Sequence, residues 1–233
     1  MPRLIFIHGD KGGVGKSVLA RALLDHYIRN DIAVDAYDSD KRNPDISRFY
    51  AKRLPVSLVD LASHQAFDAV LDRLAAGQGR ALVDLAAGAG DALHTLVTGD
   101  VKLAGALTEL NARATVVYVL SRSRPSVAGL GVALKDFQDV PADWVVVRNT
   151  YFGAADRFSR YETSNARKEA LARGAREIVM PELLDDLYDE LDQASTPFMN
   201  AAEAGALSFT NRRRVRAWIE AMDAQIATVA DIL

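Results

Sequence analysis

Short apolar runs rich in Val and Ile alternate with longer segments of helical periodicity along this 233-residue chain. The runs are apolar at nearly every position, which is typical of strands that are buried on both faces of a parallel sheet. Their length and composition predict strands at Arg3 to His8, Ile32 to Tyr37, Arg80 to Leu85, Ala114 to Leu120, Trp144 to Arg148 and Glu177 to Met180.

The segments between these runs carry apolar residues at helical spacing. They predict helices at Lys16 to Arg29, Gln65 to Ala76, Ser126 to Phe137, Arg157 to Ala172, Glu182 to Leu191 and Thr210 to about Ile232. Thr210 is the expected N-cap of the last helix. The alternation of the two kinds of segment predicts an α/β fold with a mostly parallel twisted sheet flanked by helices on both faces. We expect a single domain over residues 1–233, with residues 208–233 as a C-terminal helix packed on it.

The composition narrows the possible functions. With 49% hydrophobic and 25% charged residues, the chain resembles an ordinary soluble globular protein, and the absence of cysteine excludes thiolate metal sites and cysteine nucleophiles. No apolar run approaches the roughly 18 residues of a membrane span, and charge appears too early for a signal peptide, so we expect a cytoplasmic protein without a membrane partner. A net charge of −3 means that nucleic-acid binding would need a local basic patch.

The stretch HGDKGGVGKSVLA, which begins at His8, follows a predicted strand and opens a predicted helix. Glycines in this setting let backbone N–H groups point at phosphate oxygens, and the helix N-terminus adds partial positive charge. Lys16 would contact the β and γ phosphates, and the Ser17 hydroxyl would bind Mg²⁺. The alternative is a flexible turn without function. The predicted nucleotide-binding residues of the loop are Gly12, Gly13, Val14, Gly15, Lys16, Ser17 and Val18.

The letters KGGVGKS resemble the deviant Walker A loop of the ParA/MinD superfamily of ATPases, whose signature lysine stands where this chain has Lys11. The resemblance implies a P-loop NTPase fold in which that lysine reaches the nucleotide of the other subunit of a dimer. Lys11 is therefore expected to make dimerisation depend on ATP. Asp10 departs from the glycine of the strict pattern, and an acid so close to phosphates should be repelled unless it faces away or pairs with a cation.

Acidic residues follow two further predicted strands. VDAYDSDKRNPD contains Asp38 and Asp40, and RALVDLAAGAG contains Asp84. The first segment resembles the switch of the superfamily, which implies that Asp38 orients the attacking water, and the second resembles its Walker B element. With Lys11 and Lys16, Asp38 forms the expected catalytic set. Ser17, Asp40 and Asp84 form the expected metal site. The alternative for Asp38 and Asp40 is an acidic exit from a strand into a turn.

Two later segments resemble the places where the superfamily holds the base of its nucleotide. Asn149 follows a buried strand, and its amide can both donate to and accept from adenine, although a single Asn after a strand is also an ordinary turn residue. Pro181 would shape the loop that borders the base. Tyr151 and Phe152 could border the base or pack, with packing favoured. The acids at 185 and 186 are expected to be solvated on a helix surface.

The resemblance implies an ATP-binding switch that hydrolyses ATP slowly and dimerises with ATP and Mg²⁺ bound, positioning or helping to partition or transfer plasmid DNA or a protein cargo. Similarity to the TraL-type proteins of conjugative plasmids rests on the letters NTYFG and FTNRRRVRAWIE. A protein activator or cargo is the expected partner. The alternative is a metabolic ATP-dependent synthetase or amidoligase on the same fold, which would need a substrate pocket beside the γ-phosphate.

Non-specific DNA is a further candidate partner. Its contacts would be Arg212, Arg213, Arg214 and Arg216, which lie close together at the start of the predicted C-terminal helix. Arg212 and Arg216 are one helical turn apart and therefore share a face. Such a patch can bind phosphates without recognising sequence. The alternative is a solvated helix face, which is common on surface helices.

Overall fold

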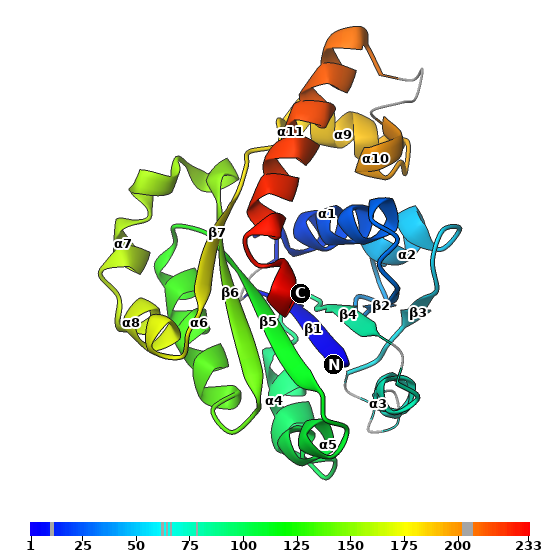
Figure 1. The fold of residues 1–233 in the computed structure, drawn as a ribbon. Helices are drawn as coiled ribbons and strands as arrows, with labels where there is room; N and C mark the ends of the chain where they lie inside the picture. The colour runs from blue at the N-terminus through cyan, green and yellow to red at the C-terminus, as the bar shows by residue number, and fades with distance from the viewer. Residues whose placement is uncertain (10–11, 62, 64, 66, 78, 202–206) are drawn as a thin grey trace.

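The computed structural model describes residues 1–9, 12–61, 63, 65, 67–77, 79–201 and 207–233. Its centre is a seven-stranded parallel sheet in the order β3-β2-β4-β1-β5-β6-β7 (Figure 1). The strands are β1 (Arg3–His8), β2 (Val34–Asp38), β3 (Val56–Leu58), β4 (Arg80–Asp84), β5 (Arg113–Leu120), β6 (Ala142–Asn149) and β7 (Arg176–Met180). All the strands predicted from the sequence are present, and the short edge strand β3 is additional.

Helices cover both faces of the sheet, as predicted. Successive residues of a strand point to opposite faces, so Ile5 and Ile7 of β1 join one apolar core and Leu4 and Phe6 join the other. The first core is covered by α1 (Lys16–Arg29), α2 (Asp45–Tyr50), α9 (Asp185–Gln193), α10 (Phe198–Ala201) and α11 (Phe209–Ala227). The second is covered by α3 (Asp68–Ala75), α4 (Gly90–Thr98), α5 (Leu103–Glu109), α6 (Arg124–Asp136), α7 (Ser159–Glu162) and α8 (Asn165–Ala172).

Most of the predicted helices differ from the structure at their ends. Helices α3, α6 and α9 are shifted by one to three residues at each end, and the C-terminal helix ends at Ala227 instead of near Ile232. The segment expected to be one helix from Arg157 to Ala172 is divided, because the Ser164 side chain caps a new helix by accepting from the Arg167 N–H at 3.0 Å. The C-terminal helix begins after Ser208 instead of Thr210, because the Ser208 hydroxyl accepts from the Asn211 N–H at 3.1 Å. The short helices α2, α4, α5 and α10 were not predicted. Elements of this length complete few helical turns and give a weak periodic signal.

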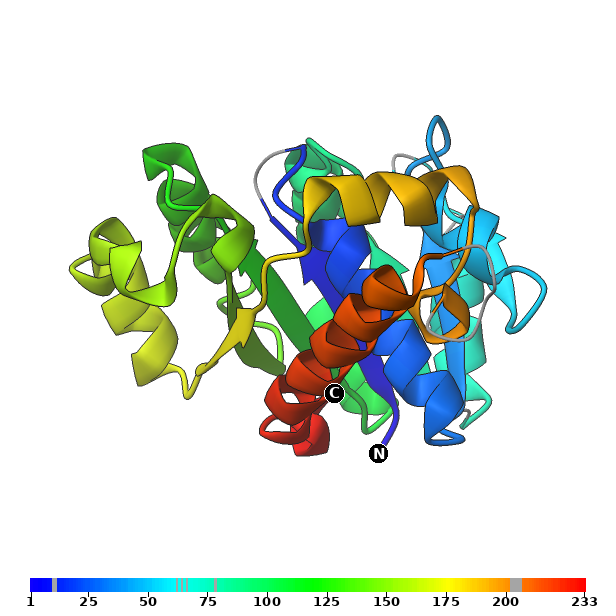
Figure 2. The ribbon, with the colours of Figure 1, turned by 90° about the horizontal axis from the view of Figure 1, so that it is seen from above.

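The C-terminal helix α11 crosses the face of the sheet that carries α1 (Figure 2). Its Trp218 packs on Phe198 of α10, with the ring centres 4.8 Å apart, and donates from Nε1 to the carbonyl of Pro181 at 2.9 Å. The side-chain oxygen of Gln225 accepts from the N–H of Val179 on the edge strand β7 at 2.8 Å. These contacts join α11 to the loop that follows β7.

A buried ionic group lies between α1, α2 and α10. The guanidinium of Arg21 is fully buried and stacks on Phe49, 3.5 Å from the ring centre, while Phe198 lies 4.4 Å away. The carboxylate of Asp25 accepts from the Tyr50 hydroxyl at 2.7 Å and from the Met199 N–H at 2.8 Å. Burial raises the pKa of Asp25 to about 6, because the charged form loses more hydration than its neighbours replace.

This raised pKa predicts a pH dependence of stability. Between about pH 4 and pH 6 the folded protein keeps the proton on Asp25 that an unfolded aspartate, with a pKa of 3.8, has released. The contribution of Asp25 to the free energy of unfolding therefore falls as the pH rises through this window, by on the order of 2 kcal/mol. Asp25→Asn should flatten the pH dependence of urea unfolding by this amount relative to wild type. The exposed Asp72→Asn is the control, and identical pH profiles for wild type and Asp25→Asn would contradict the expectation.

Candidate functional site

The glycine-rich loop connects β1 to the N-terminus of α1. Gly13 and Gly15 have φ values of 75° and 99°, a left-handed backbone that glycine adopts without steric cost. Helix α1 begins at Lys16, which is buried apart from 6% of its surface. The described part of the loop therefore has the strand, turn and helix setting that phosphate binding needs. Asp10 and Lys11 lie outside the described residues.

The side chain of Asn149 holds the backbone of this loop by a hydrogen bond. At the end of β6 its Nδ2 donates to the carbonyl of Val14 at 2.9 Å, and its Oδ1 accepts from the N–H of Tyr151 at 3.0 Å. A Cβ atom on Gly15 would lie 2.6 Å from Nδ2 of Asn149 and 2.8 Å from Cε of Met180. Gly15 is thus needed both for its backbone conformation and for the close approach of the Asn149 side chain. The assignment of Asn149 to the nucleotide base stays a prediction.

Gly15→Ala should therefore lose ADP affinity as well as stability. We expect a loss of roughly 1–3 kcal/mol in unfolding free energy, because alanine is strained at this φ and displaces Asn149. Gly77→Ala is a matched control, since Gly77 has φ +76° but open space for 4 Å around the place that a Cβ atom would take. ADP titration and urea unfolding of both variants check this. Equal ADP affinity in the two variants would contradict the role of the Gly15–Asn149 contact.

Two buried carboxylates meet at the ends of neighbouring strands. Asp38 ends β2 and Asp84 ends β4, and the two are directly paired in the register of the sheet. Burial raises the pKa of Asp84 to about 7. The nearby Ser17 hydroxyl opposes this shift, and the charge of Asp38 adds to it. Oδ1 of Asp84 is buried and has no hydrogen-bond partner among the described residues. This oxygen is suited to a cation or to water held by a cation.

Asp38 anchors helix α2. Its Oδ2 accepts from the N–H groups of Ile46 at 3.0 Å and Ser47 at 3.4 Å, and its Oδ1 accepts from the N–H of Asp40 at 3.1 Å. Burial raises its pKa to about 6, against these three bonds, which favour the charged form. Asp40 is partly exposed, and its Oδ1 accepts from the backbone of the following turn. The carboxylates at 38 and 40 therefore shape the segment that leads into α2.

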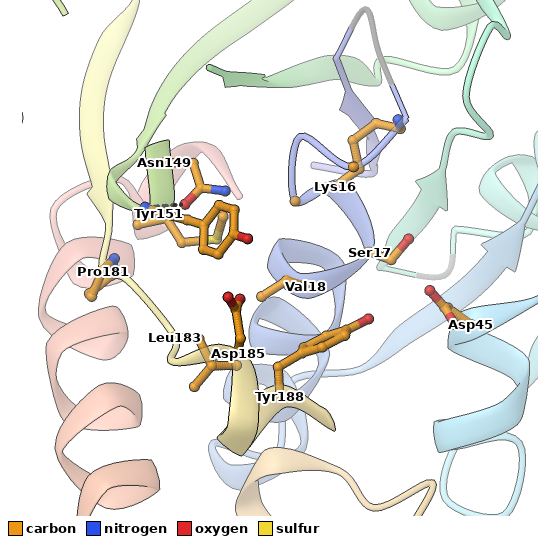
Figure 3. Close-up of a pocket in the computed structure, with 13 residues that line it drawn as sticks. Lys16, Ser17, Val18, Asp45, Asn149, Tyr151, Pro181, Leu183, Asp185 and Tyr188 are labelled. Atoms are coloured by element: carbon orange, nitrogen blue, oxygen red, sulfur yellow. Dashed lines mark hydrogen bonds between the residues drawn. The ribbon is translucent and has the colours of Figure 1, made fainter. Parts of the chain in front are cut away.

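A cavity of about 330 Å³ lies between the first residues of α1, the end of β6, the loop after β7 and helix α9 (Figure 3). At the end of the cavity that Ser17 lines, the Asp45 carboxylate of α2 faces the Ser17 hydroxyl (Figure 3). The sequence did not single out Asp45, because only the fold brings the start of α2 to this place. The cavity is lined by Gly13, Gly15, Lys16, Ser17, Val18, Asp45, Asn149, Tyr151, Met180, Pro181, Leu183, Asp185 and Tyr188.

The far end of the cavity is formed by the loop after β7 and the start of α9. Pro181 lies there, next to the apolar side chains of Met180 and Leu183. Its assignment to the nucleotide base stays a prediction. Tyr151 and Asp185 come from opposite walls and point toward each other (Figure 3). From the sequence we expected Tyr151 to pack and Asp185 to be solvated. Residue type alone does not show that a side chain lines a cavity.

The oxygen atoms at this site suit Mg²⁺, which is bound partly by phosphates and water, better than a metal ion that is bound by protein side chains alone. Within the described ranges, no three His, Cys, Asp or Glu side chains form a group that could hold a metal. Mg²⁺ is commonly held by one or two protein oxygens together with phosphates and water. Ser17 and the free oxygen of Asp84 fit this mode of binding, and Asp45 lies nearby.

The arginines of α11 are spread over its surface. Arg212 is half-buried and donates to the Leu207 carbonyl at 2.7 Å, while Arg214 donates to Asn211 at 2.9 Å. The side chains of Arg213, Arg214 and Arg216 are exposed. Arg212 and Arg216, which were expected to share one open face, therefore differ in exposure.

A second arginine group was not predicted. Arg122, Arg157 and Arg160 line a hollow of about 480 Å³ together with Ser159, and we call them the corner arginines. The hydrogen bonds and ion pairs of the described residues do not include their guanidinium groups. Arg122 and Arg160 also border a hollow with Gly12 and Gly13, so these two arginines lie near the glycine-rich loop.

Three solved structures resemble this chain over most of its length. A nucleotide-binding protein from Archaeoglobus fulgidus, in complex with ADP and with cobalt found, is 19% identical with a TM-score of 0.53 and covers 82% of this chain and 86% of its own. The MinD cell division protein from Aquifex aeolicus is 15% identical with a TM-score of 0.51, at 92% and 97% coverage. The MinC:MinD complex from Aquifex aeolicus is 15% identical with a TM-score of 0.52, at 93% and 96% coverage. The chain therefore has the P-loop NTPase fold.

Similarity to known protein sequences is more limited than similarity to solved structures. Protein MobD from Acidithiobacillus ferrooxidans is 28% identical to this chain over 190 residues, which is 81% of each protein. No known protein-family profile matches the chain. In the part of the chain that the structure describes, no helix is both long enough and apolar enough to cross a membrane.

Proposed function

We propose that this protein is a cytoplasmic ATP-binding switch of the ParA/MinD type, which hydrolyses ATP slowly and dimerises when ATP and Mg²⁺ are bound. The observation that carries the proposal is the glycine-rich loop with Lys16 and Ser17 beside Asp84, whose buried Oδ1 lacks a hydrogen-bond partner among the described residues. The cargo would be plasmid DNA or a protein, and the resemblance to TraL-type proteins supports a role in plasmid transfer or partition.

The residues divide the work of phosphate binding and hydrolysis. Backbone N–H groups of the loop and Lys16 would hold the phosphates, and Ser17 with Asp84, Asp40 and their waters would hold Mg²⁺. Bound Mg²⁺ would neutralise charge that develops on the transferred phosphoryl group. We keep Asp38 as the residue that orients the attacking water. Its bonds to Ile46 and Ser47 add a second role, because any movement of Asp38 would also move α2.

Lys11 is proposed to complete the site of the other subunit. Light scattering of Asp38→Ala, which should slow hydrolysis, is expected to show a monomer with Mg²⁺ADP and a dimer with Mg²⁺ATP. In that background Lys16→Ala should lower ATP affinity by at least about 100-fold, since it removes a charged hydrogen-bond donor from the phosphates. Lys11→Ala should retain ATP binding and lose the dimer.

Asp38→Asn is a second variant that should slow hydrolysis and preserve the ATP-bound state. It keeps a hydrogen-bond acceptor for the N-terminus of α2. An unchanged mass with ATP demonstrably bound would contradict the switch and favour the metabolic synthetase or amidoligase. Equal dimerisation of Lys11→Ala and its parent would remove only the role of Lys11.

Non-specific DNA is proposed to bind the exposed arginines of α11. Replacing Arg213, Arg214 and Arg216 by Ala should weaken binding to every duplex sequence and reduce the salt slope by about 0.9 for each phosphate that is no longer neutralised. The matched variant replaces the three corner arginines and removes the same charge. Fluorescence anisotropy with random-sequence duplexes over a salt series measures both. Loss of binding in the corner variant alone would move the DNA-binding surface from α11 to the corner arginines.

A further inference from the structure

The fold brings the corner arginines together from two separate loops. Strands β1, β5 and β6 are neighbours and run parallel, so the loops that follow them leave the same edge of the sheet. Arg122 follows β5, whereas Arg157 and Arg160 lie in the segment that follows β6. The loops at the carboxyl ends of parallel strands are where α/β proteins bind ligands. Three guanidinium groups therefore meet at a place that suits a ligand.

The positive charge of this hollow is not balanced by acids of the described chain. Glu162 of α7 pairs instead with Arg148, at 3.7 Å, and the ion pairs among the described residues include no corner arginine. Nε of Arg122 is buried and has no hydrogen-bond partner among the described residues. A buried donor without an acceptor costs free energy, and like charges in one hollow repel each other. A bound anion would relieve both costs.

The position of Arg122 is fixed by a glycine. Gly153 has a φ of 124°, a backbone conformation that other residues rarely adopt. A Cβ atom at this residue would lie 2.9 Å from Nη1 and 3.3 Å from Cζ of Arg122. Any side chain here would therefore displace the guanidinium group. The close packing of Arg122 on Gly153 holds the arginine in place before a ligand binds, which lowers the entropic cost of binding.

The chemistry of the hollow suits phosphate better than a carboxylate. Each guanidinium group presents five N–H donors in a planar fork, which can form two parallel bonds to a phosphate or a carboxylate. Three such groups, with the Ser159 hydroxyl beside them, offer more donors than the two oxygens of one carboxylate can accept. A phosphate ion has four oxygens and carries up to two negative charges near neutral pH, so it can contact several arginines at once.

We propose that the corner arginines form a phosphate-binding site, separate from the glycine-rich loop, which takes inorganic phosphate. The site does not depend on the proposed nucleotide-binding function, because its arginines do not line the nucleotide cavity. The phosphodiester groups of nucleic acid share part of this chemistry but carry one charge each. The experiment therefore separates free phosphate from DNA.

Calorimetric titration with inorganic phosphate at low ionic strength and without nucleotide tests the proposal. Lys16→Ala serves as the parent, because this change weakens phosphate binding at the glycine-rich loop. The parent should bind phosphate, and adding Arg122→Gln should lower the affinity at least about tenfold, the effect of losing a hydrogen bond between charged groups. Adding Arg213→Gln is the matched control, since it removes the same charge from the exposed surface of α11 and should leave the affinity unchanged.

Gly153→Ala tests the geometry without removing a charge. In the same parent it should also lower phosphate affinity at least about tenfold, because the new methyl group displaces Arg122. Gly174→Ala is its control, since Gly174 has a φ of +81° but no atom within 4 Å of the place that a Cβ atom would take. It introduces comparable backbone strain and should keep phosphate binding. Circular dichroism confirms that both variants are folded.

Equal phosphate affinity in the parent and its Arg122→Gln variant would overturn the proposal. Binding by wild type that is lost in the Lys16→Ala parent would overturn it too, because the phosphate would then occupy the glycine-rich loop. The third arm is fluorescence anisotropy with a random-sequence duplex. Absence of phosphate binding, together with weaker duplex binding in Arg122→Gln, would assign the corner arginines to nucleic acid and overturn the site for free phosphate.

Discussion

The site depends on the burial of two carboxylates at the paired ends of β2 and β4. Parallel pairing places Asp38 directly beside Asp84, and burial raises the pKa of the first to about 6 and that of the second to about 7. Ionised carboxylates this close in a poorly hydrated place repel each other unless a cation or N–H donor compensates. The N-terminus of α2 supplies donors to Asp38. Asp84 has the Ser17 hydroxyl nearby, but its Oδ1 has no hydrogen-bond partner among the described residues. A bound cation would therefore be stabilised most at Asp84.

Helix α2 connects this site to the C-terminal part of the chain. Its start is held by Asp38, Arg48 of the same helix bonds to Asp192 of α9, and Phe49 stacks on the buried guanidinium of Arg21. Arg21 also lies against Phe198 of α10, which packs on Trp218 of α11. A displacement of α2 would therefore alter contacts of α9 and α10, because the interior between them is closely packed and includes an ionic group that tolerates little rearrangement.

The parts of the fold that could be predicted were those with a strong local signal. Helix α1 has the bounds expected from its apolar face, and the predicted strands are present because their side chains are buried on both sides of the sheet. The division at Ser164 could not be predicted from periodicity, since it depends on one hydroxyl capping a new helix. Helix α2 was also missed, because its first turn is stabilised by Asp38, which precedes it in the chain and reaches it only through the fold.

The sequence by itself determined the α/β architecture and the glycine-rich loop between β1 and α1, because alternating apolar segments and the spacing of Gly12, Gly13, Gly15 and Lys16 are local properties of the chain. It also indicated that acids follow β2 and β4. Only the tertiary structure decided what individual side chains do. Asn149 supports the loop through Val14, and Asp185 enters the cavity beside Tyr151. These outcomes depend on which hydrogen-bonding groups distant segments present to one another, and neither residue type nor spacing contains that information.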